Sequence, residues 1–559
     1  MFSFILGLIQ FSFTVIIGLY FWGQLRSQRA DQKGIEADTK VELERLNAMR
    51  KVTLTQPLTE KTRPRSLDEI VGQAEGVKAV RVGLCGPNPQ HILIYGPPGV
   101  GKTAASRVAL EEAKKNEVSP FGPNAKFIEV DATIMHYDER SIADPLIGSV
   151  HDPIYQGAGA YGPAGVPQPK EGAVSKAHGG VLFIDEIGEL QPIQMNRLLK
   201  VLEDRKVNFE SAYYSSTNKN IPRHIHDMFK NGIPADFRLV GATTRSPEEL
   251  PPALRSRCME IFFNPLEKED LEKILDNALQ RLEITLAPGA GEMICSYAKN
   301  GRDTVQILQT LSSKLALENR KTGELSDVEW IIETGRYTPV CRETIEEGER
   351  VGVVNGLAVA DGGSGLLMPI EVTAEPAEHE MGRTLCTGIM ERETMNRGGL
   401  SLTRTSTAKA AVSNVMTVLK TIYGIETEDY DIHINFAGGM PVDGPSAGTA
   451  VFAACYSALR GQPVGNQFAF TGELSIKGLV KPVGGVAAKI EAAQRAGAKT
   501  VFIPKQNYQK KFADYTIEVV CVESIQEIIS RIFRPAAEKV VEIAAGEPKQ
   551  GLASAQRQE

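Results

Sequence analysis

The sequence predicts a multidomain α/β chain, in which an α/β module with a helical lid is followed by an α+β domain and preceded by a single amino-terminal transmembrane helix. Three observations lead to this fold class. Residues 2–23 are apolar and uncharged. An apolar run at 91–95 leads through a glycine-rich loop into a helical pattern. After about residue 341 the sequence changes to an alternating, strand-like pattern. A chain of 559 residues is long enough for about three to five folding units.

Changes in composition along the chain give the expected boundaries. They are a transmembrane anchor at 1–23, a linker at 24–60, an α/β core at 61–265, a helical lid at 266–340, an α+β domain at 341–535 and a disordered tail at 536–559.

The amino-terminal run is long enough to be a membrane anchor. As a helix rising about 1.5 Å per residue, residues 2–23 would span about 33 Å, against a hydrocarbon core of about 30 Å. Tyr20 and Trp22 lie at its far end, where aromatic rings suit the membrane interface. A cleaved signal peptide is the alternative, but no basic residue precedes the run and three follow it between positions 26 and 33. We expect an uncleaved single-pass anchor with the rest of the chain in the cytoplasm.

The charge and cysteine content of the chain indicate which partners and which cellular compartment to expect. A net charge of −7 without a basic domain or stripe argues against a specific nucleic-acid partner. The seven cysteines are scattered and form no Cys-x-x-Cys pair, which favours reduced thiols in a cytosolic compartment. His224 and His226 lie beside Asp227 and could ligate a metal ion, but a polar loop is the interpretation that we favour.

The glycine-rich loop predicts a phosphate-binding site. Residues 96–103 match G-x-x-x-x-G-K-[ST], in the strand–loop–helix context that this motif requires. Glycines allow backbone N–H groups to close around phosphates, and the start of a helix favours negative charge. Lys102 is expected to contact the β and γ phosphates of ATP, and the Thr103 hydroxyl is expected to ligate Mg²⁺. The loop residues expected to bind nucleotide are Gly96, Pro97, Pro98, Gly99, Val100, Gly101, Lys102 and Thr103.

A second apolar run, residues 181–184, ends in two carboxylates. Asp185 is expected to hold Mg²⁺ through its water shell, so it completes the nucleotide-binding set. Glu186 is expected to polarise the water that attacks the γ phosphate. An apolar run followed by Asp-Glu is a weak signal alone and a strong one downstream of a phosphate-binding loop.

A third apolar run at 238–244, followed by PPALRSR, completes a pattern that resembles the AAA+ family of ring-forming ATPases. The resemblance implies that Thr244 takes the sensor-1 position. It also implies that Arg257 is an arginine finger that reaches the γ phosphate of the next subunit, with Arg255 as the rival residue.

The helical lid and a loop between the two ATPase motifs extend this resemblance. Arg302 is the candidate for the lid arginine called sensor 2. Leu146 and Ile147 occupy the positions of a pore loop that grips the substrate chain, although the expected aromatic residue is missing. Tyr155 and Tyr161, in the glycine-rich stretch that comes after it, are the alternatives.

A serine on a glycine-rich turn marks the last domain. Ser446 lies at the start of an apolar helical stretch, where its Oγ is exposed and free N–H groups can stabilise an oxyanion. Because no histidine follows His433, a Ser-His-Asp triad would have to recruit that residue or a distant one. A lysine can serve as the base if burial lowers its pKa from about 10.4 towards 7–8. Lys489 has the most apolar neighbours, and Glu491 should point away from it.

The motifs GGMPVDGPSAG and TGELSIKGLVKPVGGVAAKIEAA resemble the proteolytic domain of Lon proteases. The resemblance implies that Ser446 is the nucleophile and Lys489 the general base. It places Thr471 where a hydroxyl orients the lysine, and it includes Asp443 in the motif without a defined role.

The resemblance covers residues 61–535, and it implies an ATP-dependent serine endopeptidase of the B type. A short anchored amino terminus is similar to the bacterial LonB of spore-forming bacteria. The resemblance further implies a homo-hexamer that uses ATP and Mg²⁺ to unfold and thread unfolded or tagged proteins into an internal chamber. We expect it to serve protein quality control or regulated degradation at the cytoplasmic face of the membrane, with a link to sporulation.

Two other functions compete with this hypothesis. GATTRSPEELPPALRSR also resembles branch-migration ATPases that act on DNA, but that function leaves the anchor and the last domain unexplained. A membrane-tethered chaperone with an inert peptidase-like domain is the second alternative, and the presence of both Ser446 and Lys489 argues against it.

Overall fold

A computed structural model describes the fold. The described residues are 17, 20, 22, 46, 49, 58–135, 144–151, 168–211, 214–217, 221–340, 344–359, 365–377, 381–388, 392–397, 400–437 and 444–533. The chain divides into two compact units, Met1–Arg63 and Pro64–Glu559. Within the described part, no helix has both the length and the apolar character needed to cross a bilayer. The predicted anchor at 2–23 lies almost wholly outside the described residues, and the tail at 536–559 lies wholly outside them.

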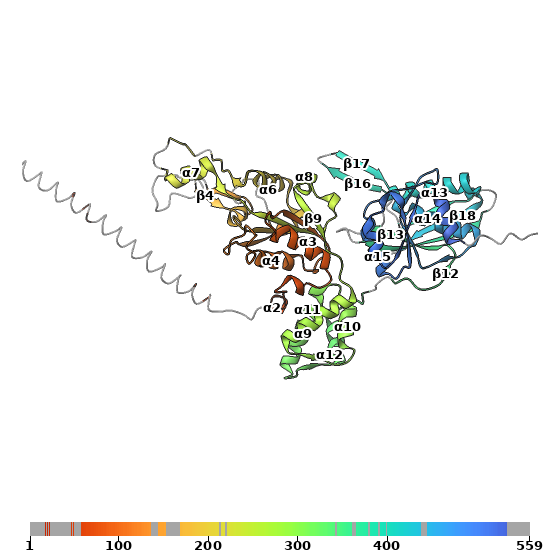
Figure 1. The fold of residues 1–559 in the computed structure, drawn as a ribbon, viewed down its shortest axis with the longest axis horizontal. Coiled ribbons are helices and arrows are strands. Elements are labelled where there is room, and N and C mark those ends of the chain that lie inside the picture. Colours follow the sequence, from red (N-terminus) through yellow and green to blue (C-terminus); the bar gives the residue numbers. More distant parts are fainter. Residues whose placement is uncertain are drawn as a thin grey trace, which may run out of the picture. The chain divides into compact units, whose positions relative to one another are not determined.

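The second unit begins with a five-stranded parallel sheet in the order β2-β5-β8-β1-β9 (Figure 1). Its strands are β1 (His91–Tyr95), β2 (Phe127–Asp131), β5 (Val181–Asp185), β8 (Arg238–Thr243) and β9 (Cys258–Phe262). The helices of this module are α3 (Ala74–Cys85), α4 (Lys102–Ala113), α5 (Ala173–Lys176), α6 (Pro192–Asp204), α7 (Arg223–Asn231) and α8 (Pro252–Arg255), whereas α2 (Leu58–Lys61) belongs to the first unit.

Both faces of this sheet are buried, as its apolar strands require. Side chains alternate along a strand, so neighbouring residues of β1 enter different cores. Ile92 and Ile94 pack in one core with α3 and α4. Leu93 and Tyr95 pack in the other with α5 and α6. Because the strands are parallel, the segments after β1, β5 and β8 all meet at one edge of the sheet.

Short antiparallel pairs decorate this module, and a helical lid comes after it. The pairs are β3 (Gly148–His151) with β4 (Gln168–Glu171) and β6 (Lys206–Val207) with β7 (Ile233–Pro234). The lid consists of α9 (Lys268–Leu282), α10 (Ala290–Tyr297), α11 (Gly301–Leu317) and α12 (Leu325–Gly335), with the parallel pair β10 (Thr285–Leu286) and β11 (Thr322–Gly323).

The last domain is built on a mixed seven-stranded sheet in the order β15-β18-β14-β13-β20-β23-β24. The strands are β13 (Val353–Val359), β14 (Gly365–Pro376), β15 (Thr384–Thr387), β18 (Tyr430–Phe436), β20 (Phe468–Phe470), β23 (Thr500–Pro504) and β24 (Glu518–Val522). Smaller pairs are β12 (Glu349–Arg350) with β19 (Val464–Gly465), β16 (Arg392–Arg397) with β17 (Leu400–Thr405), and β21 (Glu473–Leu474) with β22 (Val480–Lys481).

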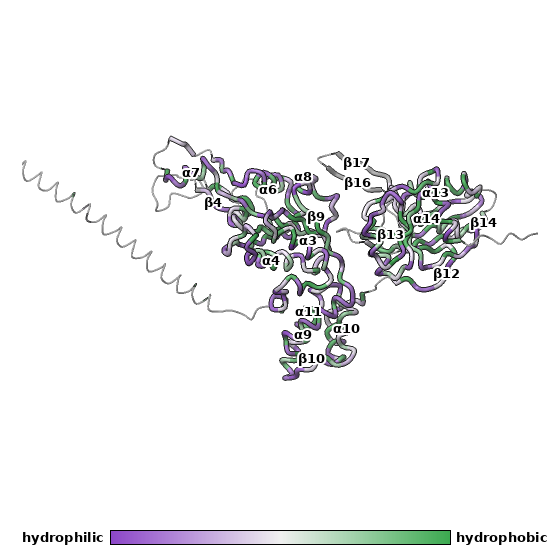
Figure 2. The backbone as a smooth tube through the Cα atoms, viewed as in Figure 1, coloured by the Kyte–Doolittle hydropathy of each residue, from purple (hydrophilic) through white to green (hydrophobic). Residues whose placement is uncertain are grey.

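Helices cover both faces of this second sheet. Helices α13 (Thr407–Tyr423), α14 (Gly448–Arg460) and α16 (Ile525–Ile532) share one apolar core with it, and α15 (Val486–Arg495) belongs to another. In Figure 2 the hydrophobic colour is concentrated in the interior of this domain, around β13 and α14. The structure confirms the multidomain α/β architecture that the sequence predicts.

Candidate functional sites

The glycine-rich loop joins β1 to α4 in a conformation that its glycines make possible. Gly96, Gly99 and Gly101 have φ values of 149°, 77° and 101°, which residues with a Cβ rarely adopt. A Cβ on Gly96 would lie 2.4 Å from the carbonyl oxygen of Phe263, so glycine is also required for space. The loop ends at Lys102, the first residue of α4. This is the strand–loop–helix arrangement that a phosphate-binding loop requires.

Lys102 is a buried amine with oxygen partners. Its side chain is 6% exposed. Its Nζ donates to the carbonyl oxygens of Gly96 at 2.6 Å and Pro97 at 3.2 Å. Burial lowers its pKa, and the charges of Glu186 and Asp185 act in the opposite direction. Carbonyl and carboxylate oxygens around one amine favour its charged form, which is the form that binds phosphate.

Carboxylates gather at the same edge of the sheet. Burial raises the pKa of Asp185, and the neighbouring charges of Glu186 and Asp131 add to that effect. Asp131 ends β2 in register with Asp185, and the sequence analysis did not single it out. The described part of the chain holds no group of three or more His, Cys, Asp or Glu side chains that could bind a metal alone. Mg²⁺ is compatible with this, because it binds through one or two carboxylates plus phosphates and supplies charge compensation.

Glu186 and Thr244 contact each other directly. The backbone N–H and the Oγ1 of Thr244 both donate to Glu186 Oε2, at 3.0 and 3.1 Å. Glu186 has a φ of 47°, which turns it away from the path of β5. Both bonds go to one oxygen, and Oε1 of Glu186 accepts no hydrogen bond among the described residues, so it could accept one from a water molecule. The structure therefore brings together the residue predicted to polarise water and the predicted sensor-1 residue.

The lid contacts the phosphate loop through the start of α11. Asn300 caps this helix, its side chain accepting from the Asp303 N–H. A Cβ on Gly99 would lie 2.5 Å from Asn300 Oδ1, so loop and cap pack against each other. Arg302, two residues further, is exposed, and its charge lowers the pKa of Lys102. Arg302 thus lies within electrostatic range of the predicted nucleotide site. Asn300 was missed, although an N-cap residue before a helical run is a readable signal.

The two arginines of PPALRSR have different surroundings. Arg255 Nε donates to Glu260 at 2.7 Å, inside the subunit. Arg257 Nη1 donates to the carbonyl oxygen of Ala253 at 2.8 Å, and its other contact, with Glu203, is longer at 3.9 Å. Its side chain is 41% exposed. Arg257 is therefore the more available of the two cations.

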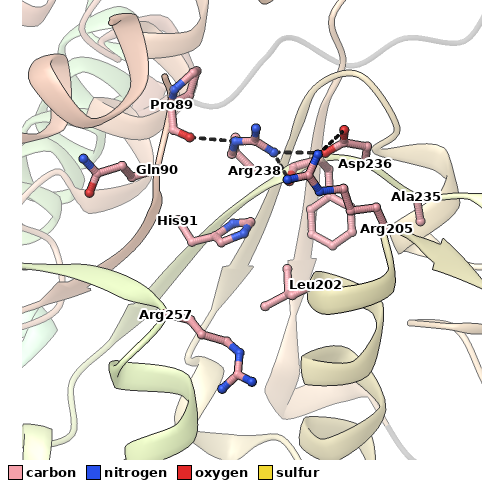
Figure 3. Close-up of a pocket in the computed structure, with 10 residues that line it drawn as sticks. Pro89, Gln90, His91, Leu202, Arg205, Ala235, Asp236, Arg238 and Arg257 are labelled. Atoms are coloured by element: carbon pink, nitrogen blue, oxygen red, sulfur yellow. Dashed lines mark hydrogen bonds and ion pairs between the residues drawn. The ribbon is translucent and has the colours of Figure 1, made fainter. Parts of the chain in front are cut away.

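Arg257 lies at the opposite edge of the sheet from the phosphate loop. Cys258, the next residue, is in register with His91, which begins β1, whereas the loop comes after the end of β1. Arg257 lines a cavity of about 250 Å³ together with His91, Arg205 and Arg238 (Figure 3). With about 3.3 Å per strand residue, β1 separates this cavity from the loop. This register places Arg257 far from the nucleotide site of its own subunit.

The structure argues against the predicted pore loop at Leu146 and Ile147. Their side chains are 0% and 8% exposed and belong to the core below the sheet. Asp144 Oδ1 accepts from both of their backbone N–H groups, at 3.0 and 3.1 Å, which folds the segment into a tight buried turn. Side chains in a core cannot grip a substrate. The alternatives Tyr155 and Tyr161 lie outside the described residues.

In the last domain, Ser446 lies on a short 3-10 turn, Pro445–Ala447, directly before α14. Its side chain is half-buried. The N–H of Gly472 donates to the Ser446 carbonyl oxygen at 2.9 Å, and the N–H of Thr449 donates to the Gly472 carbonyl oxygen at 3.1 Å. A Cβ on Gly472 would lie 2.8 Å from Val480, so glycine allows this close approach. The pairing fixes Ser446 beside the segment that carries Thr471.

Lys489 is buried on α15 and reaches Thr471. The two side chains are 3% and 1% exposed. Lys489 Nζ donates to Thr471 Oγ1 at 3.1 Å. Burial lowers the pKa of Lys489 to about 8. Thr471 is also held by its own N–H, which donates to the Phe502 carbonyl oxygen at 3.0 Å. The structure thus joins the predicted base to the predicted orienting hydroxyl, beside the turn of Ser446.

Among the described residues, the other polar side chains considered as candidates form no hydrogen bond or ion pair with Lys489. Glu491 accepts from the Tyr515 hydroxyl at 3.0 Å, and no charge of Glu491 contributes to the pKa of Lys489, so it points away as expected. His433 lies on β18, and its Nε2 contacts Thr387 Oγ1 at 3.2 Å. Asp443 lies outside the described residues.

Two other expectations change. The N–H groups of Gly448 and Thr449 are bonded to the carbonyl oxygens of Pro445 and Gly472, so an oxyanion would have to use other N–H groups of this helix start. His224 and His226 lie on the helix α7 rather than on a loop, and His226 Nδ1 contacts the Tyr214 hydroxyl at 3.0 Å. No metal-binding cluster occurs here among the residues that the structure describes.

Comparisons with known proteins match both modules. Residues 66–222 match the family described as magnesium chelatase, subunit ChlI, and residues 326–534 match the Lon protease (S16) C-terminal proteolytic domain. The chain is 53% identical over 525 residues to Lon protease 2 of Bacillus subtilis, covering 94% of this chain and 95% of that protein. It is 31% identical over 457 residues to the archaeal Lon protease of Methanothermobacter thermautotrophicus, covering 74% of this chain and 65% of that protein.

A nucleotide-binding motor and a proteolytic domain in one chain define an ATP-dependent serine protease. The chain belongs to the Lon protease family. Its motor is of the AAA+ type, which uses ATP and Mg²⁺ in general, and neither the DNA motor nor the inert chaperone accounts for these matches.

The contact between Lys489 and Thr471 generates a prediction. Thr471→Val keeps the shape but removes the one hydrogen-bond partner that Lys489 Nζ has among the described residues. We expect kcat for cleavage of a short fluorogenic peptide to fall by about 10- to 100-fold with little change in KM, since the base loses its orientation and not its substrate. Thr471→Ser restores the hydroxyl and should recover most of kcat. An unchanged kcat in Thr471→Val would remove Thr471 from the site.

Proposed function

We propose that the chain cleaves proteins with a Ser446–Lys489 dyad in the internal chamber of a homo-hexameric ring, that its motor unfolds and threads the substrates, and that residues 2–23 tether the ring to the cytoplasmic face of the membrane. This is the B type of Lon protease. Quality control or regulated degradation at that membrane, including during sporulation, is the cellular role that fits it.

The observation that carries the proposal is the buried amine of Lys489. With a pKa of about 8, about one amine in ten is neutral at pH 7, against about one in 2,500 at an ordinary pKa of about 10.4. A neutral amine accepts a proton, and Thr471 directs its nitrogen. A surface lysine in an ion pair would do neither.

The dyad transfers one proton in each direction. Lys489 Nζ takes the proton of Ser446 as Oγ bonds to the scissile carbonyl carbon, and the resulting ammonium gives that proton to the leaving amine when the C–N bond breaks. In the second half, the same amine takes a proton from water, the water oxygen bonds to the acyl carbon, and the proton returns to Ser446 Oγ as the ester bond breaks.

The motor residues take the roles that the family pattern implies. Lys102 compensates the charge of the β and γ phosphates, while Thr103 and Asp185 would hold Mg²⁺. Glu186, held by Thr244, orients the attacking water. Arg302 approaches the same site from the lid.

Arg257 acts in trans in this proposal. Because Arg257 lies at the edge of the sheet opposite the phosphate loop, its side chain cannot reach the nucleotide of its own subunit. Its exposure leaves it available to a neighbouring subunit, where it would stabilise the γ phosphate in the transition state. This argument favours a ring, and six subunits is the size that the family resemblance implies.

Separate domains should give separable activities. Ser446→Ala should abolish cleavage of casein while ATP hydrolysis survives, because the serine and the phosphate loop belong to domains that are built on different sheets. Glu186→Gln should stop degradation of a stable folded substrate while a short peptide is still cut slowly, because only unfolding needs phosphoryl transfer.

The matched control is Ser413→Ala, which removes an exposed hydroxyl from α13 of the same domain and should change neither activity. Loss of both activities in Ser446→Ala with the oligomer intact would count against the division of labour. Undiminished degradation of the folded substrate by Glu186→Gln would refute the motor assignment.

A further prediction concerns the anchor. Residues 2–23 are apolar and uncharged, with their basic flank downstream. The full-length protein should stay in the membrane fraction through salt and carbonate washes. A form lacking residues 1–23 should be soluble and keep most ATP-dependent casein cleavage, because the catalytic groups fold elsewhere in the chain. Full-length protein recovered wholly in the soluble fraction would refute the anchor, and a mature amino terminus near residue 24 would indicate a signal peptide.

A further inference from the structure

A chain of three polar side chains joins the strand before the phosphate loop to the segment that carries Arg257. The hydroxyl of Tyr95 donates to Glu260 Oε1 at 2.9 Å. Arg255 donates to the same carboxylate through Nε at 2.7 Å and Nη2 at 3.4 Å. Tyr95 is 0% exposed, and the side chains of Arg255 and Glu260 are 33% and 28% exposed. We call these three residues the Tyr95–Glu260–Arg255 chain.

The register of β1 and β9 explains why the chain forms. Glu260 is in register with Leu93, and Phe262 with Tyr95, so Tyr95 and Glu260 point to the same face of the sheet. Tyr95 and Phe262 also stack, with ring centroids 5.0 Å apart. Hydrogen bonds from Arg255, and then from Tyr95, lower the pKa of Glu260, so the carboxylate stays ionised and both bonds are charge-assisted.

At one end the chain is tied to the nucleotide site. Tyr95 directly precedes Gly96, whose carbonyl oxygen accepts from Lys102 at 2.6 Å and whose N–H donates to the Thr243 carbonyl oxygen at 3.2 Å. The carbonyl oxygen of Tyr95 accepts from the Phe263 N–H at 2.8 Å. The backbone of Tyr95 is therefore continuous with the phosphate loop and is held by the same set of hydrogen bonds.

At the other end the chain is tied to Arg257. Arg255 is the last residue of α8, and Arg257 comes two residues later, with its N–H bonded to the Leu254 carbonyl oxygen at 3.1 Å. The guanidinium of Arg257 is bonded back to Ala253 of the same helix at 2.8 Å. Since α8 and Arg257 form one hydrogen-bonded piece, the contact between Arg255 and Glu260 sets where that piece lies on the sheet.

We propose that the Tyr95–Glu260–Arg255 chain positions the arginine finger that each subunit offers to its neighbour, and ties that finger to the phosphate loop of the subunit that carries it. The inference rests on the proposed role of Arg257 in trans. Tyr95, Glu260 and Arg255 are positioning residues, and Arg255 is not itself the finger. An exposed ion pair would contribute little to position, but a fully buried tyrosine shares this carboxylate and limits its freedom.

Mixed rings test the proposal. A Glu186→Gln subunit retains Arg257 but does not hydrolyse ATP, and an Arg257→Ala subunit retains its catalytic site but offers no finger. Rings of either variant alone should be inactive, so ATP hydrolysis in the mixture reports fingers that Glu186→Gln donors supply to Arg257→Ala acceptors. A substitution in the Tyr95–Glu260–Arg255 chain is introduced only into the donor, because the ATPase site of the donor is already inactive.

With the donor Glu186→Gln/Glu260→Gln, we expect the hydrolysis restored in the mixture to fall by about tenfold or more, because a displacement of about 1 Å of a catalytic group has effects of this order. With the donor Glu186→Gln/Tyr95→Phe, which keeps the Arg255 contact, the restored hydrolysis should fall by about threefold. This donor replaces Glu186→Gln/Glu260→Gln if the latter does not fold. The control donor Glu186→Gln/Glu292→Gln breaks an exposed pair with Lys268 in the lid and should restore hydrolysis fully. Native mass spectrometry checks that mixed rings form.

Each outcome supports or overturns the positioning role. Hydrolysis restored equally by the Glu260→Gln and parent donors would overturn it, because the finger would then work without the Glu260 carboxylate. No restored hydrolysis with the parent donor, in mixed rings shown to form, would overturn the trans role of Arg257 and this inference with it, while leaving the Ser446–Lys489 proposal untouched.

Discussion

Burial of an amine on α15 is the constraint on which the proteolytic domain depends. Lys489 is 3% exposed, and its Nζ has one hydroxyl, Thr471 Oγ1, as its partner among the described residues. An ammonium in that position is disfavoured because a hydroxyl does not compensate a positive charge as a carboxylate does. Next to Thr471, the close approach that pairs Gly472 with Ser446 leaves no room for a larger residue than glycine. Thr471, the hydrogen-bond partner of this amine, therefore lies next to the residue that pairs with Ser446.

The motor contains the opposite solution to the same problem. Lys102 is 6% exposed, almost as buried as Lys489. Its Nζ is bonded to two carbonyl oxygens, and the carboxylates of Asp185 and Glu186 favour its charge. Burial lowers the pKa of both lysines, but only at Lys102 do nearby carboxylates act against that effect. The charges around each nitrogen, together with its burial, distinguish the two sites.

Motifs with a fixed local geometry were predictable from the sequence. Apolar runs predicted the central strands, and the glycines before Lys102 predicted the phosphate loop. Both structures could be predicted because each depends mainly on residues that are neighbours in the sequence. Long-range features were not. Leu146 and Ile147 are apolar in any pattern, and only the turn built on Asp144 shows that they are buried. The choice between Arg255 and Arg257 needed the register of β1 and β9, which no local pattern encodes. Asp443 and nearly all of the predicted anchor lie outside the described residues, and those predictions stand as predictions.

The pH dependence of peptide cleavage tests the central claim, that Lys489 acts as a neutral base, most directly. The measurement is kcat/KM of the full-length protein for a short fluorogenic peptide between about pH 6 and 10. This range separates a base with a pKa near 8 from a lysine of ordinary pKa, which would titrate near 10.4. The amine is active when neutral, so the account predicts a rate that rises about tenfold per pH unit at low pH and levels off above a midpoint near 8. A midpoint near 6.5 that disappears in His433→Ala would instead identify a histidine base. That result, or a rate independent of pH across the range, would contradict the account.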